Sequence, residues 1–143
     1  MAAPDDPACS LAKAVELVGE RWTIFVLHEA LMGATRFSEF RSRLGIASDV
    51  LTARLAKLVD SGLLARHGYR EPGQRARDCY LLTESGRRVS VVLCALQQWG
   101  GEHFPDVAPD VEYRTAGGRP VSVRFVDDEG AVTPPDEVRV RRP

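Results

Sequence analysis

Polar and basic side chains recur between Ser48 and Lys57 in a pattern that suits contact with nucleic acid. Apolar residues at 51, 55, 58 and 59 have the period of an amphipathic helix, which leaves one polar face outward. The major groove of DNA admits one helix, where Arg or Lys can reach guanine or phosphate and Ser or Thr can donate to bases or backbone. We therefore predict that this face contacts DNA through Ser48, Asp49, Thr52, Arg54 and Lys57.

A second basic cluster lies between two short apolar runs, residues 63–66 and 78–82. The runs predict the strands of a hairpin, and Pro72-Gly73 supplies the chemistry of a turn between them. Arginines on a slender loop can follow the DNA backbone into the minor groove, where arginine responds to groove width and potential. The residues that we predict to contact DNA from this hairpin are Tyr69, Arg70, Arg75 and Arg77.

Each of these basic residues, taken alone, fits an ordinary solvated surface as well as it fits a DNA contact. A helix-turn-helix pattern is also common in all-α proteins. The joint arrangement is more specific, because a basic hairpin follows directly after the helix pair, as it does in a winged helix. The combination therefore favours DNA binding.

Other chemistries find no support in the residue pattern. The three histidines, His28, His67 and His103, lack the spacing to Cys or acids that a zinc site needs, so we expect no metal. Neither a nucleophile motif nor a glycine-rich phosphate loop is present, so we expect no cofactor and no enzyme activity. Cys79 and Cys94 are expected to be small core residues, with all cysteines as thiols.

The charge of the chain is unevenly distributed along its 143 residues. The formal net charge is -1, yet the segment from Arg36 to Arg88 carries eleven Arg and Lys residues against six Asp and Glu residues. A basic face can therefore exist on a nearly neutral chain. The opening segment is acidic where a secretory signal would be basic, and no apolar run is long enough to span a bilayer, so we expect a cytoplasmic protein without membrane contact.

Periodicity and capping residues predict a mainly helical α+β fold, a winged helix-turn-helix. Ser38 and Ser48 are expected to cap the third and fourth helices, and Thr83 a last helix that Gly100-Gly101 ends. The expected helices span residues 10–18, 22–32, 38–44, 48–61 and 84–99. A strand at 121–126 that turns back to residue 132 predicts a small C-terminal hairpin. The predicted divisions are a flexible N-terminus (1–8), a DNA-binding and dimerisation domain (9–103) and a C-terminal extension (104–143).

Several motifs in fixed order resemble the HxlR family of winged helix-turn-helix regulators, which have a MarR-like architecture. The matching stretches are residues 9–19, 20–23, 36–40, 50–55, 58–63, 80–86 and 98–100. The resemblance implies a homodimer that binds double-stranded DNA, with the helix from Ser48 as recognition helix and Arg77 as the wing arginine. The family's wing carries a Pro-Pro-Arg-like run, whereas this chain has Gln74-Arg75-Ala76-Arg77.

From this likeness we expect a transcription regulator, more often a repressor, on a pseudo-palindromic operator. We add Arg36, Ser38 and Arg41 to the DNA surface, and expect the first and last helices to form the dimer through Leu11, Val15, Val92, Leu96 and Trp99. Candidates for sensing an oxidant or a small-molecule effector are Cys9, whose thiol is a sensor in some family members, and Trp22. The alternative is a winged-helix module that binds a partner protein rather than a specific DNA sequence.

Overall fold

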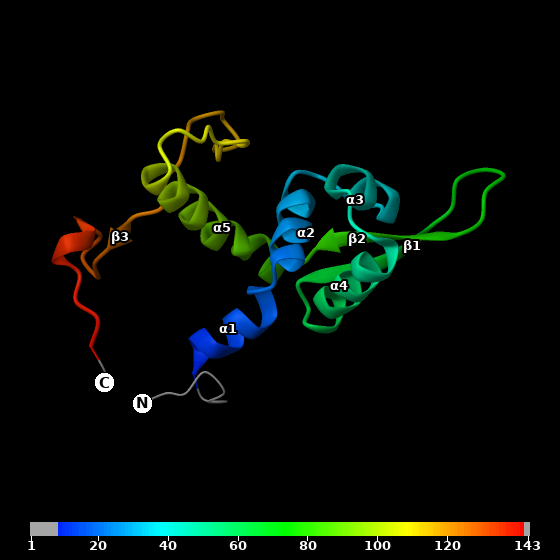
Figure 1. Cartoon of the computed structure of the whole chain (residues 1–143), viewed down its shortest axis with the longest axis horizontal. Coiled ribbons are helices and arrows are strands. Elements are labelled where there is room, and N and C mark those ends of the chain that lie inside the picture. The colour runs from blue at the N-terminus through cyan, green and yellow to red at the C-terminus, as the bar shows by residue number, and fades with distance from the viewer. Residues whose placement is uncertain (1–8, 142–143) are drawn as a thin grey trace. The chain divides into compact units, whose positions relative to one another are not determined.

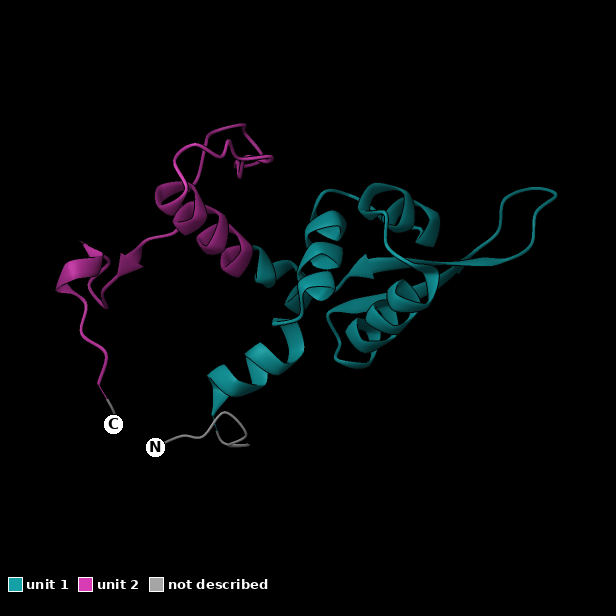
Figure 2. Ribbon diagram, viewed as in Figure 1, with its two compact units in different colours: residues 1–90 teal, residues 91–143 magenta. Residues whose placement is uncertain are grey.

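The computed structural model describes residues 9–141, which form two compact units. The first unit extends to Ser90 and the second begins at Val91 (Figure 2). Helix α5, Glu84–His103, starts in the first unit and ends in the second. The structure therefore divides within this helix, and the predicted domain bounds at residues 8 and 103 stay a prediction.

Four helices and one hairpin make up most of the first unit (Figure 1). The helices are α1 (Ser10–Val18), α2 (Arg21–Leu31), α3 (Phe37–Leu44) and α4 (Ser48–Asp60). Their shared core is apolar because α2 and α4 each present a helical stripe to the interior. The largest fully buried side chains are Phe40, Leu27, Leu51, Leu55, Leu58, Leu64, Val26 and Thr23. The predicted fold class, a mainly helical winged helix, is confirmed.

The starts of α3 and α4 correct two predicted caps. Ser38 lies inside α3, whose N-cap is Arg36, and Ser48 is the first residue of α4 after the N-cap Ala47. At α3, Glu39 takes over the capping because its carboxylate accepts hydrogen bonds from the backbone N–H groups of Thr35 and Arg36, at 2.8 and 3.0 Å. The turn between the two helices passes through Gly45, whose φ of 61° favours glycine.

The predicted wing is an antiparallel hairpin of β1 (Leu64–Tyr69) and β2 (Arg77–Leu82). The register pairs Leu64 with Leu82 at the base and Tyr69 with Arg77 at the far end. Figure 1 shows the loop between the strands extending well beyond the helices of this unit. Residues 70–76 therefore stand on a projecting loop.

Helix α5 begins where predicted and ends later. The Thr83 hydroxyl accepts a hydrogen bond from the Gly86 N–H at 3.0 Å, which confirms the predicted cap. Gly100 and Gly101 do not stop the helix, which continues to His103. Neither glycine adopts the positive φ that would terminate it.

The C-terminal extension lies on α5 within the second unit. It contains the predicted hairpin, shorter than expected, as β3 (Phe125–Val126) and β4 (Val132–Thr133), followed by η1 (Pro135–Glu137). Two adjacent α5 side chains hold it. The Gln98 side chain donates a hydrogen bond to the carbonyl of Val123 at 3.2 Å and accepts one from the N–H of Val123 at 3.1 Å. The Gln97 side chain donates to the carbonyl of Val111 at 2.6 Å. Sequence patterns gave no sign of either role.

Candidate nucleic-acid interface

Helix α4 presents a face of small and polar residues to solvent. Its apolar stripe, Leu51, Leu55 and Leu58, is fully buried, which fixes the rotation of the helix. The Thr52 hydroxyl donates to the carbonyl of Ser48 at 2.8 Å. The exposed residues of α4 are Ser48, Asp49, Thr52, Ala53, Ala56 and Asp60. Ala53 and Ala56 were not among the predicted site residues, although their small size permits close approach to a groove.

The two cations of α4 are both engaged by one carboxylate. Arg54 forms an ion pair with Glu20, and the Lys57 ammonium lies 3.1 Å from the same side chain. Lys57 also donates to the carbonyl of Glu16, in the last turn of α1, at 2.8 Å. These contacts lower the pKa of Glu20, chiefly through the Lys57 hydrogen bond, which outweighs the raising effect of desolvation, and the charges of Arg54 and Lys57 lower it further. Direct contact of Arg54 and Lys57 with DNA stays a prediction.

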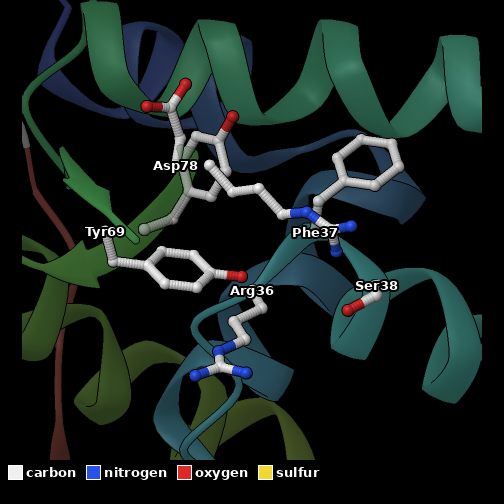
Figure 3. Close-up of a pocket in the computed structure, with 7 residues that line it drawn as sticks. Arg36, Phe37, Ser38, Tyr69 and Asp78 are labelled. Carbon is white, nitrogen blue, oxygen red and sulfur yellow. The ribbon is translucent and has the colours of Figure 1, made fainter. Parts of the chain in front are cut away.

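A hollow of about 380 Å³ lies between the start of α3 and the wing (Figure 3). Its lining includes Arg36, Ser38, Tyr69 and Arg77, four of the predicted DNA contacts. Tyr69 reaches across it from the wing toward the α3 side, and the Arg36 guanidinium lies 4.6 Å from the centre of its ring. The tertiary structure thus brings together predicted residues from two distant segments.

A second hollow, of about 370 Å³, adjoins the first along α3. It is lined by Phe37, Ser38, Arg41 and Ser42, so the two hollows share Phe37 and Ser38. Together they extend along α3 from the wing arginine Arg77 to Arg41.

Intramolecular partners divide the predicted arginines of α3 and the wing into two groups. Arg36 is held by Glu71 of the wing loop at 2.8 Å, and the Arg70 guanidinium donates to the carbonyl of Gln74 at 3.2 Å. Between residues 9 and 141, no carboxylate lies within 4.0 Å of the charged groups of Arg41, Arg75 or Arg77. These three exposed guanidinium groups are therefore available to an external anion.

Sequence reasoning missed three acids: Glu20 and Glu71, which pair with basic side chains, and Glu39, which caps α3. The pKa of Glu39 is lowered by the two backbone N–H groups that it caps. A weak sequence signal existed for Glu39 alone, since an acid three residues after a helix start suits a capping box.

The predicted dimer residues are apolar and exposed. Their exposed fractions are 70% for Leu11, 57% for Val15, 48% for Val92, 50% for Leu96 and 59% for Trp99. The first two lie on α1 and the other three on α5. Solvent-exposed apolar faces of this kind are typical of interaction surfaces.

The two candidate sensor residues lie at the ends of helices. Cys9 is the N-cap of α1, and its Sγ accepts a hydrogen bond from the Ala12 N–H at 3.5 Å. Trp22, near the start of α2, is half-buried beside Phe25, with the Arg21 guanidinium 5.4 Å from its ring centre. Cys94 is buried in the core, as predicted, whereas Cys79 is only half-buried and lies outside the fully buried core.

No group of three or more His, Cys, Asp or Glu in residues 9–141 is placed to hold a metal ion. Across the same range, none of the helices has the length and apolar character needed to cross a membrane.

A helix-turn-helix followed by a basic hairpin defines the winged helix-turn-helix class. Comparison with known families gives a narrower assignment. The sequence model of the HxlR-like helix-turn-helix family matches residues 17–108, and the chain belongs to this family. The resemblance noted from the motifs is confirmed. The family and the relatives are transcriptional regulators and not enzymes.

Individual relatives support the same assignment. An uncharacterized HTH-type transcriptional regulator of Mycobacterium tuberculosis (strain ATCC 25618 / H37Rv) is 43% identical over 96 residues, which are 67% of this chain and 60% of the relative. The chain thus matches less than two thirds of that protein.

Two solved structures resemble this chain. The crystal structure of PA1607, a candidate transcription factor, is similar with a TM-score of 0.77 and 30% identity, over 96% of both chains. That match takes in the C-terminal extension. The reduced form of the redox regulator HypR is similar with a TM-score of 0.59 and 26% identity, over 68% of this chain and 95% of HypR.

Proposed function

We propose that this chain is a transcription regulator that binds double-stranded DNA as a homodimer in the cytoplasm. The observation that carries the proposal is the pair of adjoining hollows along α3, which have free arginines at both ends, Arg41 and Arg77. Guanidinium groups bind phosphate oxygens with charge-assisted hydrogen bonds, and such contacts position a protein on the duplex. The hollows are therefore proposed to follow one strand of the DNA backbone.

Helix α4 is proposed to enter the major groove beside this strand. Its exposed Ser48, Asp49 and Thr52 offer donors and acceptors to base edges, and Ala53 and Ala56 permit close approach. The wing loop, with Arg75, projects toward the neighbouring minor groove. Arg36 lies at the edge of the first hollow, where its ion pair with Glu71 competes with phosphate for the guanidinium.

The dimer is proposed to form through the exposed apolar residues of α1 and α5. A twofold pair would present two α4 helices to half-sites about 34 Å apart, one turn of B-form DNA. The regulator would act as a repressor by occupying a pseudo-palindromic operator.

Fluorescence anisotropy with a labelled duplex at several salt concentrations tests the proposal. The duplex is selected from a random-sequence pool by the wild-type protein. Arg41→Gln and Arg77→Gln should each weaken binding and reduce the slope of log K against log salt by about one phosphate contact. Arg124→Gln, in the second unit, is the matched control and should leave both quantities unchanged. If all three variants bind DNA equally, the adjoining hollows along α3 do not follow the DNA backbone. If binding shows no salt dependence, a protein-binding module is favoured instead.

Redox control by Cys9 is a second candidate, supported by its N-cap position and by the likeness to HypR. The Cys9 thiol is partly exposed, and its Sγ accepts a hydrogen bond from the Ala12 N–H at the start of α1. Diamide treatment should release DNA from the wild-type protein but not from Cys9→Ser. Equal release from both proteins would discard the switch.

A small-molecule effector would have a candidate site in the second unit. A hollow of about 500 Å³ between α5 and the extension is lined by Trp99 and Phe125, among others, and the Gln98–Val123 hydrogen bonds hold its wall in place. A thermal shift by an aromatic compound that disappears in Trp99→Ala would support this site, and a shift of equal size in both proteins would not.

A further inference from the structure

One carboxylate, that of Glu20, controls all the positive charge of the proposed recognition helix. Arg54 and Lys57 are the only cationic residues of α4, and both pair with Glu20. Glu20 is the N-cap of α2 and lies 37 positions before Lys57, so the contact is tertiary and not local.

The geometry holds these two cations tightly on the α1–α2 side of α4. The Lys57 ammonium has two partners, the Glu20 carboxylate and the Glu16 carbonyl at the end of α1, where a cation is also favoured by the helix dipole. The Arg54 side chain is only 27% exposed, and its Nε atom is buried without a hydrogen-bond partner in the described chain. The Arg54 guanidinium would have to give up its ion pair with Glu20 in order to reach a phosphate.

We propose that Glu20 is a specificity-determining residue, which keeps Arg54 and Lys57 away from the phosphate backbone when α4 enters the groove. This inference rests on the proposed DNA binding. Lys and Arg contacts to phosphates supply sequence-independent affinity, whereas base edges supply discrimination. With its cations held by Glu20, α4 meets DNA through Ser48, Asp49, Thr52 and two alanines, and the phosphate contacts fall to the arginines of α3 and the wing.

The test compares Glu20→Gln with Glu16→Gln. Both variants remove one negative charge near the start of the chain. The Glu16 side chain, however, forms no ion pair in the described structure, and only the Glu16 backbone carbonyl contacts Lys57. Anisotropy is measured with the selected operator duplex and with the same duplex after both half-sites are scrambled.

Glu20→Gln should raise affinity for the scrambled duplex about three- to tenfold and steepen its salt slope by about one to two, as the released cations meet phosphates. The ratio of operator to scrambled affinity should fall accordingly. Glu16→Gln should change both affinities by less than about twofold and in equal proportion. The double variant Glu20→Gln/Lys57→Gln should return the salt slope toward the wild-type value.

If Glu20→Gln does not fold, Arg54→Gln and Lys57→Gln test the same idea from α4. Each should leave the affinity and salt slope for the scrambled duplex within about twofold of wild type, because a held cation contributes no phosphate contact. A tenfold loss in these variants, or identical behaviour of Glu20→Gln and Glu16→Gln, would overturn the inference. A wild-type protein that binds neither duplex would instead refute the proposed function, so the two failures are distinguishable.

Discussion

The guanidinium of Arg36 lies 2.8 Å from the carboxylate of Glu71, which joins the start of α3 to the loop of the wing. Both side chains are about two-fifths exposed, so solvent screens the pair. Its main consequence is positional, because it holds Arg36 against Tyr69 at the edge of the first hollow.

Glu71→Gln should therefore change DNA binding more than stability. We expect the free energy of unfolding to shift by less than about 0.5 kcal/mol, as is usual for exposed ion pairs. Affinity for DNA should rise, since Arg36 loses an intramolecular competitor for phosphate. Urea denaturation and anisotropy measure the two effects. Glu84→Gln, at the exposed Arg88 pair on α5, is the control and should leave DNA affinity unchanged.

Replacement of Glu39 by Gln should weaken the start of α3. The carboxylate caps two backbone N–H groups, and loss of such a cap costs about 1 kcal/mol. Thermal denaturation measures the effect. An unchanged melting temperature would mean that water replaces the cap at no cost.

Acid should destabilise the wild-type protein through the same residue. The folded-state pKa of Glu39 is lowered by the N–H groups of Thr35 and Arg36, so its contribution is complete above the ordinary value of 4.5 and is lost as the pH falls through the lowered pKa. Urea denaturation between pH 7 and pH 3 should show a shallower loss of stability in Glu39→Gln than in wild type. Parallel curves for the two proteins would contradict the assignment.

Gly86→Ala should strongly destabilise the fold. A Cβ atom at this buried position would lie 2.0 Å from the backbone carbonyl oxygen of Leu63, so α5 could not pack against the turn between α4 and β1. We expect a loss of about 2–4 kcal/mol by urea denaturation. Gly100→Ala in the same helix has open space and should instead gain up to about 1 kcal/mol from helix propensity. Similar effects at both positions would refute the close contact.

Leu96→Asp should disrupt the proposed dimer. Half of this apolar side chain is exposed on α5, and a carboxylate buried in a twofold interface would be costly. Sedimentation should show wild type at twice the chain mass of 15.7 kDa and the variant shifted toward monomer. Val140→Asp, at a fully exposed apolar residue near the end of the described chain, should stay dimeric. A monomeric wild type would contradict the proposed assembly.

Local sequence patterns were sufficient to predict the secondary-structure elements of this protein. The apolar period of α4, the Thr83 cap and the two strands of the wing each reside in a few adjacent residues, and the structure contains all of them, although the first strand covers Leu64–Tyr69 rather than residues 63–66. The same patterns misplaced the caps at Ser38 and Ser48 and the end of α5. At α3 the Glu39 carboxylate caps the backbone in place of Ser38, and at α5 neither glycine adopts the positive φ that would end the helix.

The amino-acid sequence by itself determined the fold class and the list of candidate basic residues. Only the tertiary structure decided which of those charges are free. Glu20 binds Arg54 and Lys57, and Glu71 binds Arg36, across long separations in the chain, whereas Arg41, Arg75 and Arg77 have no acidic partner within residues 9–141. The physical reason is that helix periodicity depends on near neighbours, while the partner of a charge depends on how distant segments pack.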